Sequence, residues 1–90
     1  MTWYLELTYN CPLGDRDSID GIDQLIEETL DQEYDVGSLF GDSRNLTFVF
    51  STKEDAETAA EKVKHLFKEH GIQDRLRATY VYKKVYKEKG

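Results

Sequence analysis

The first part of this chain is rich in carboxylates, and their number and spacing make them the residues best suited to binding or chemistry. Residues 1–42 contain eleven aspartates and glutamates and one cation, Arg16, whereas residues 43–90 contain eleven cations and seven carboxylates. The first segment therefore carries a net charge of −10 and the second +4, which sum to the −6 of the whole chain. Such an asymmetry favours recognition of a charged partner over catalysis.

Seven of these carboxylates are expected to form one acidic ridge on a helix and on the segment before it. At 100° per residue, five of them lie opposite or beside the apolar stripe of the helix, and two precede it near the positive end of its dipole. No lysine follows them at four-residue spacing, so their mutual repulsion is not offset there. The ridge comprises Asp15, Asp17, Asp20, Asp23, Glu27, Glu28 and Asp31. The alternative interpretation is an ordinary solvated helix face.

A calcium loop is excluded because its register fails. A loop that begins at Asp15 needs an oxygen ligand at position five, a glycine at position six and a glutamate at position twelve. The chain has Ile19, Asp20 and Ile26 at those positions.

The cysteine and the two histidines also form no recognisable site. His65 and His70 are five residues apart, about 140° around a helix, and Cys11 has no identifiable base beside it. A 90-residue chain leaves little interior for a pocket, so an enzyme would have to complete its site at a dimer interface. We therefore predict no catalytic residue, no cofactor and no metal ion.

Six elements are expected to position these residues. Alternating apolar side chains predict strands, and apolar side chains at three- and four-residue spacing predict helices. Residues 41–45 join the middle two strands as a hairpin with a loop of a few residues. Ser51 with Glu54, or Thr52 with Asp55, is a candidate start for the longer helix. The strands are expected at 3–9, 35–40, 46–50 and 76–86, and the helices at 19–33 and 51–71.

The order β-α-β-β-α-β predicts a ferredoxin-like α+β sandwich, a four-stranded antiparallel sheet with two helices on one face, as a single domain over residues 1–90. The chain has no run of about 18 apolar residues and no signal-peptide pattern. We therefore expect a cytoplasmic protein without a membrane partner.

The sheet face away from the helices is the second candidate surface. Residues 44–50, followed by Glu54, Asp55 and Ala56, resemble the third strand and second helix of RNA-recognition domains. That resemblance implies bases stacked on tyrosines and a phosphate backbone held by cations. Whether Tyr80 and Tyr82 or their neighbours face outward is open at this point. The candidate residues are Tyr4, Arg44, Arg77, Tyr80, Tyr82 and Lys83.

The preferred hypothesis is a small acidic interaction module, a regulator or inhibitor whose first helix docks on the basic surface of a partner protein. In a narrower form, the carboxylates mimic the phosphates of a nucleic acid. RNA binding through the sheet is the alternative, although the negative charge disfavours nucleic acid as a partner. A homodimer through the tyrosine face, and a small enzyme with its site at a dimer interface, remain open.

Overall fold

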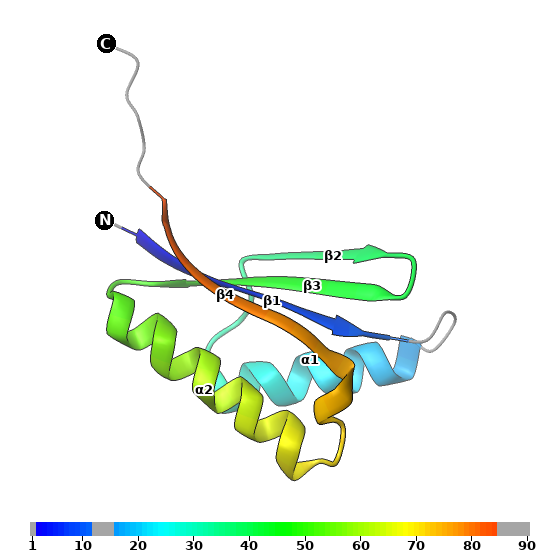
Figure 1. Ribbon diagram of the computed structural model, residues 1–90. Helices are drawn as coiled ribbons and strands as arrows, with labels where there is room; N and C mark the ends of the chain where they lie inside the picture. The colour runs from blue at the N-terminus through cyan, green and yellow to red at the C-terminus, as the bar shows by residue number, and fades with distance from the viewer. Residues whose placement is uncertain (1, 12–15, 85–90) are drawn as a thin grey trace.

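The structure is a computed structural model that describes residues 2–11 and 16–84. Four strands and two long helices follow one another in the expected order (Figure 1). A short 3-10 turn at Gln73–Arg75, which the sequence did not predict, leads into the last strand. The elements are β1 (Thr2–Asn10), α1 (Arg16–Leu30), β2 (Val36–Phe40), β3 (Ser43–Phe50), α2 (Lys53–Glu69) and β4 (Leu76–Lys84).

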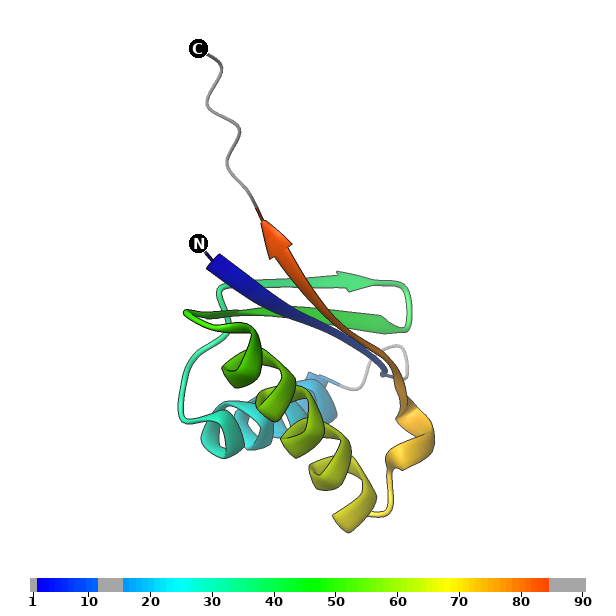
Figure 2. The ribbon, with the colours of Figure 1, turned by 60° about the vertical axis from the view of Figure 1, so that its left-hand side comes forward.

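The strands form one sheet in the order β2-β3-β1-β4, and every neighbouring pair is antiparallel. Both helices cover the same face of this sheet, and the other face is left open (Figures 1 and 2). The prediction of a ferredoxin-like α+β fold is confirmed. Among the described residues, no helix has both the length and the apolar character that crossing a bilayer requires.

The core lies between the sheet and the helices, because each strand directs alternate residues toward the helix layer. Leu5, Leu7 and Tyr9 of β1 are fully buried there, as are Leu46 and Phe48 of β3. Each such apolar side chain contributes roughly 1.5–3 kcal/mol through its burial. The helices supply Ile22, Ile26, Ala59, Ala60, Val63 and Phe67 to the same cluster.

The hairpin between β2 and β3 is tighter than the sequence suggested. We expected a loop over residues 41–45, but the turn consists of Gly41 and Asp42, and the facing pair Phe40 and Ser43 already belongs to the strands. Gly41 has φ of 61°, which suits the first central position of a two-residue type II′ turn. The predicted loop is therefore wrong, and Arg44 falls within β3, on the side of the sheet that faces the helices.

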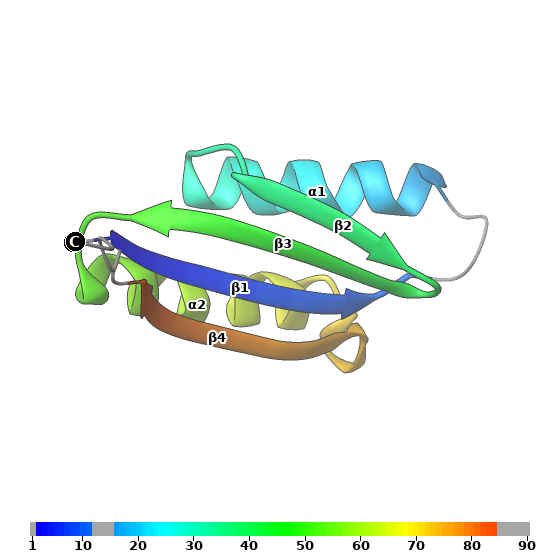
Figure 3. The ribbon, with the colours of Figure 1, turned by 90° about the horizontal axis from the view of Figure 1, so that it is seen from above.

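The two sheet edges differ in character. β2 forms one edge and β4 the other, with α1 running along the β2 side of the sheet and α2 nearer the β4 side (Figure 3). Along β4, Tyr80 and Tyr82 face the open side, because they pair with Glu6 and Tyr4 of β1. Residues 85 and 86, which we expected to continue this strand, lie outside the described residues.

Candidate functional site

The predicted acidic ridge is only partly assembled by the fold. Asp15 lies outside the described residues, and Asp17 lies within α1 in a stretch whose side chains are not described. Asp20, Glu28 and Asp31 are exposed, and Glu27 is half-buried. These four residues remain candidates for contact with a partner.

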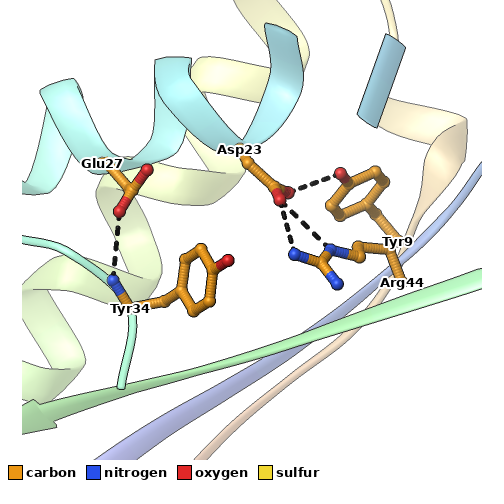
Figure 4. Close-up of polar contacts among 5 residues, drawn as sticks. All are labelled: Tyr9, Asp23, Glu27, Tyr34 and Arg44. Atoms are coloured by element: carbon orange, nitrogen blue, oxygen red, sulfur yellow. Dashed lines mark hydrogen bonds and ion pairs between the residues drawn. The ribbon is translucent and has the colours of Figure 1, made fainter. Parts of the chain in front are cut away.

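Asp23 does not belong to an exposed ridge. It is only 7% exposed, and its carboxylate points toward the sheet, where Tyr9 and Arg44 hold it (Figure 4). The expectation that Asp23 presents its charge to a partner is therefore wrong. The physical reason is its position on α1, directly beside the buried Ile22 and three residues before the buried Ile26, which turns it toward the core.

Both oxygens of the Asp23 carboxylate are occupied. The hydroxyl of Tyr9 donates to Oδ1 at 2.7 Å, and Nη2 and Nε of Arg44 donate to Oδ2 at 2.7 and 3.1 Å. Tyr9 and Arg44 are directly opposite each other on β1 and β3, so one carboxylate from α1 joins both central strands. Burial raises the pKa of Tyr9 well above its ordinary range, and the hydrogen bond to Asp23 and the charge of Asp23 raise it further. This cluster is a structural cross-link, because its polar groups are satisfied by one another.

A second contact extends from this cross-link to the segment before β2. The guanidinium of Arg44 lies over the ring of Tyr34, 5.5 Å from its centroid, and the backbone N–H of Tyr34 donates to Oε2 of Glu27 at 3.3 Å (Figure 4). Gly37 of β2 passes close above this pair, since a Cβ there would lie 2.7 Å from Cε1 of Tyr34 and 3.0 Å from Nη2 of Arg44. The end of α1 and the strand β2 are thus joined through Tyr34 and Arg44.

Most carboxylates of α1 and of the turn after it gather at the C-terminal end of the helix, whereas the exposed Asp20 lies nearer its start. The C-terminal group lines an open depression of about 450 Å³ together with Gln24 and Gln32. Glu33, which the sequence analysis did not include, belongs to this group because the chain turns back after the helix. We call the four residues Glu27, Glu28, Asp31 and Glu33 the acidic cluster.

The acidic cluster sits where the backbone itself is negative. Asp31 has φ of 54°, and the N–H groups of Asp31 and Gln32 donate to the carbonyls of Glu28 and Glu27, which is a Schellman ending. The C-terminal end of a helix carries partial negative charge, and α1 has no basic residue in its last turn. Ion pairs between described residues involve other carboxylates, namely Asp23, Asp42, Glu61 and Glu69.

The second helix ends in the same motif with the usual residues. Gly71 has φ of 68°, and the N–H groups of Gly71 and Ile72 donate to the carbonyls of Lys68 and Phe67. Lys68 places a cation in the last turn of α2. Glycine and a cation are what this position and this end of a helix favour, so α1 departs from both preferences.

The open face of the sheet carries aromatic side chains around a carboxylate. The rings of Tyr4 and Tyr82 are stacked, with centroids 5.4 Å apart, and Tyr80 is 63% exposed on the same face. Glu6 lies directly opposite Tyr80 on β1 and accepts hydrogen bonds from Asn45 at 3.2 Å and from the hydroxyl of Tyr82 at 3.4 Å. The sequence left the exposed face of β4 undecided, and the register resolves it in favour of the tyrosines.

Two of the three cations assigned to that face lie on the helix side instead. Arg44 points to the helix side, toward Asp23. Trp3 also faces the helices, because its ring lies beside Lys53 at the start of α2. Lys83 is directly opposite Trp3 in the sheet and therefore lies on the same side. Arg77 lies beside the register shift near Thr8 and is 3.9 Å from Asp42. The alternative surface therefore keeps its three tyrosines and loses two of its predicted cations, which corrects the expectation for Arg44 and Lys83.

Cys11 is buried, with 1% of its surface exposed. Within the described ranges, no group of three or more histidine, cysteine, aspartate or glutamate side chains is arranged to hold a metal ion.

The strand order, with both helices on one face, defines a ferredoxin-like α+β domain. Two crystal structures of one Agrobacterium tumefaciens protein, described in the first as a NIPSNAP family protein with unknown function, resemble this chain. The match to the first structure has a TM-score of 0.54 and covers 90% of this chain and 84% of the Agrobacterium chain. The match to the second has a TM-score of 0.53 and covers 91% of this chain and 89% of the Agrobacterium chain. At 11% sequence identity the likeness concerns the fold alone. No protein-family model and no curated protein matches the sequence.

Proposed function

We propose that this protein is an acidic interaction module that docks the C-terminal end of α1 on the basic surface of a partner protein, and so acts as a regulator or inhibitor. The acidic cluster supplies the charge, and the exposed Asp20 extends the negative surface along the helix. Cationic side chains of a partner would be attracted by the four carboxylates and by the partial negative charge of the helix end together.

The observation that carries this proposal is the contrast between the two helix ends. α2 ends with Gly71 and Lys68, which stabilise such an ending, whereas α1 ends with Asp31 in the left-handed region and with carboxylates. Each departure costs the fold a few tenths of a kcal/mol to about 1 kcal/mol. Local choices that oppose stability concentrate at functional positions, which supports a binding role for this end of α1.

The sheet face supports nucleic-acid binding less well. Its tyrosines could stack on bases, but Glu6 places a negative charge among them, and Arg44 and Lys83 point to the helix side. Phosphate binding requires cations along the nucleic-acid path.

Mimicry of nucleic acid is a narrower version of the same proposal. Carboxylates on a rigid helix end would occupy phosphate sites on a nucleic-acid enzyme. In that case duplex DNA should compete with this protein for the partner, whereas a partner with another basic surface should bind both at once.

Two charge-neutralised variants test the proposal. The first combines Glu28→Gln, Asp31→Asn and Glu33→Gln in the acidic cluster, and leaves Glu27 to accept its hydrogen bond from Tyr34. The matched control combines Glu54→Gln, Glu57→Gln and Glu61→Gln, which removes the same charge from exposed positions of α2.

Immobilised wild-type protein and both variants are used to capture partners from a native lysate, with quantitative mass spectrometry. We expect a basic protein that the wild type and the α2 variant retain equally and that the acidic-cluster variant binds about tenfold less. Equal capture by all three proteins would overturn the proposal.

A further inference from the structure

β2 is an edge strand without the usual protection of an edge. It pairs only with β3 among the described strands, all five of its residues are exposed, and none is charged or proline. Val36, Leu39 and Phe40 are 56%, 50% and 87% exposed. The opposite edge, β4, contains Arg77, Lys83 and Lys84, and charged residues of this kind discourage the addition of another strand.

The backbone of β2 offers hydrogen-bonding groups to a further strand. In a hairpin with a two-residue turn, the pair that flanks the turn is hydrogen-bonded, and bonded and non-bonded pairs then alternate along the strands. Phe40 and Ser43 flank the turn, so Leu39 and Gly37 direct their N–H and C=O groups away from β3. These groups lie along the free edge.

The surroundings of this edge are acidic. Asp35 precedes the strand and Asp42 follows it. The acidic cluster adjoins the same edge through Tyr34. The backbone N–H of Tyr34 donates to Glu27 of the cluster, and Gly37 of β2 lies close to the Tyr34 ring. Figure 3 shows α1 running along this side of the sheet.

A second copy of this chain fits the edge poorly. Antiparallel pairing of β2 with itself would bring Asp35 of each copy near Asp42 of the other, at both ends of the new ladder. Like charges facing each other across strands are destabilising. Two chains of net charge −6 also repel each other as whole molecules.

We propose that β2 accepts an extended, basic segment of a partner protein as an added fifth strand. This inference rests on the proposed function, since it specifies how the basic partner is held. Backbone hydrogen bonds to Gly37 and Leu39 provide the pairing, and apolar side chains at alternate positions of the segment, which share one face of the sheet, cover Val36 and Phe40. Lysines or arginines at the ends of the segment meet Asp35, Asp42 and the acidic cluster.

The test uses the full chain and the synthetic peptide KKVTVTVRK, with KKVTPTVRK as the peptide that cannot complete a ladder. Binding is measured by calorimetry for the wild type, Leu39→Ala and Leu39→Pro. Leu39→Ala keeps the outward N–H and Leu39→Pro removes it, while the ladder to β3 is left intact in both. We expect Leu39→Ala to bind KKVTVTVRK within about threefold of the wild type and Leu39→Pro to bind it at least tenfold more weakly.

Hydrogen exchange of the wild-type backbone provides a readout that does not depend on a variant. Bound KKVTVTVRK should slow exchange of the amides of Leu39 and Gly37, whereas KKVTPTVRK should leave both unchanged. If Leu39→Pro proves unfolded by circular dichroism, this exchange measurement alone decides the outcome.

Failure of this inference can be separated from failure of the proposed function. In one outcome, the acidic-cluster variant binds the peptide more weakly than the wild type, but the bound peptide does not protect the Leu39 and Gly37 amides of the wild type. This outcome would overturn strand addition and leave the acidic docking proposal standing. Protection of those amides with no effect of the acidic-cluster variant would support strand addition and contradict the docking proposal. An absence of peptide binding, or a wild-type dimer that Leu39→Pro dissociates, would contradict the basic-strand assignment.

Discussion

Two aspartates of α1 show how neighbouring carboxylates acquire different roles. Asp20 is exposed, whereas Asp23, less than one turn later, is buried and receives hydrogen bonds from Tyr9 and Arg44. The direction in which a helical residue points relative to the core decides the role, because a buried charge must be paired. Asp23 therefore belongs to the stability of the fold, and Asp20 belongs to its surface charge.

Asp23→Asn should destabilise the protein by about 2 kcal/mol. The amide keeps one acceptor oxygen where the carboxylate used two, and it leaves the Arg44 cation without a counter-charge. Breaking a fully buried pair costs roughly 3–5 kcal/mol, and the side chains of this pair are 10–13% exposed. Urea unfolding measures the change. Asp20→Asn is the control and should alter the free energy of unfolding by less than about 0.5 kcal/mol. Equal effects of the two substitutions would contradict the assigned roles.

Tyr9 should make the protein lose stability at alkaline pH. Burial raises its pKa in the folded chain, whereas in the unfolded chain it ionises near its ordinary value of about 10. Stability from this group is thus fully present below pH about 10 and is lost as pH rises further, because the unfolded chain releases a proton that the folded chain keeps.

The stability difference between the wild type and Tyr9→Phe isolates this effect. It should fall by about 1 kcal/mol between pH 10 and 11, since the variant lacks the group. Urea unfolding across this range provides the measurement, and a difference that stays constant would show that Tyr9 ionises normally in the folded protein.

The two helices provide a comparison within one molecule. Both end in a Schellman motif, but Gly71 occupies the left-handed position of α2 and Asp31 that of α1. Helix α1 therefore retains a less stable ending than this chain uses elsewhere. Its carboxylates account for the negative surface that we assign to partner binding.

Asp31→Gly should stabilise the fold by about 0.5–1 kcal/mol, because glycine adopts positive φ without strain and the substitution removes a charge from the negative helix end. The reciprocal change, Gly71→Asp, should destabilise it by about 1 kcal/mol. Thermal unfolding of the two variants measures both effects. A loss of stability in Asp31→Gly would mean that Asp31 supports the fold, and would contradict the assignment of this helix end to partner binding.

The periodicity of the sequence predicted the order and type of the main elements, because the alternation in β1 and the helical stripes are local patterns. The cap of α2 was narrowed to Ser51 or Thr52 by the same kind of local pattern, and the structure has Thr52, whose hydroxyl accepts from the N–H of Asp55. The hairpin was misplaced, because a strand that begins at Ser43 with Arg44 and Asn45 looks like a polar loop until its partners are known.

The candidate site was predicted less well, because its residues meet only through tertiary contacts. The Tyr9 and Arg44 pair depends on the β1–β3 register, and Asp23 reaches both only once α1 is packed on the sheet. The signal that was available was the place of Asp23 beside the apolar stripe. Glu33 joins the acidic cluster through the turn after α1, for which the sequence offered no periodic pattern.

The whole molecule carries its charge unevenly. The acidic cluster and Asp35 lie on the β2 side of the sheet, and β4, with Lys83, forms the opposite edge. A charge separation of this kind orients a protein as it approaches a charged partner. The acidic side should lead when the partner is basic, which would accelerate association at low salt.

The most direct test of the acidic docking surface is the salt dependence of binding to the basic protein captured from the lysate. Its dissociation constant is measured by calorimetry at about 50 mM and about 300 mM salt for the wild type, the acidic-cluster variant and the α2 variant. We predict that salt weakens binding steeply and equally for the wild type and the α2 variant, and much less for the acidic-cluster variant. Equal salt dependence for all three proteins would contradict the assignment of the acidic cluster as the docking surface.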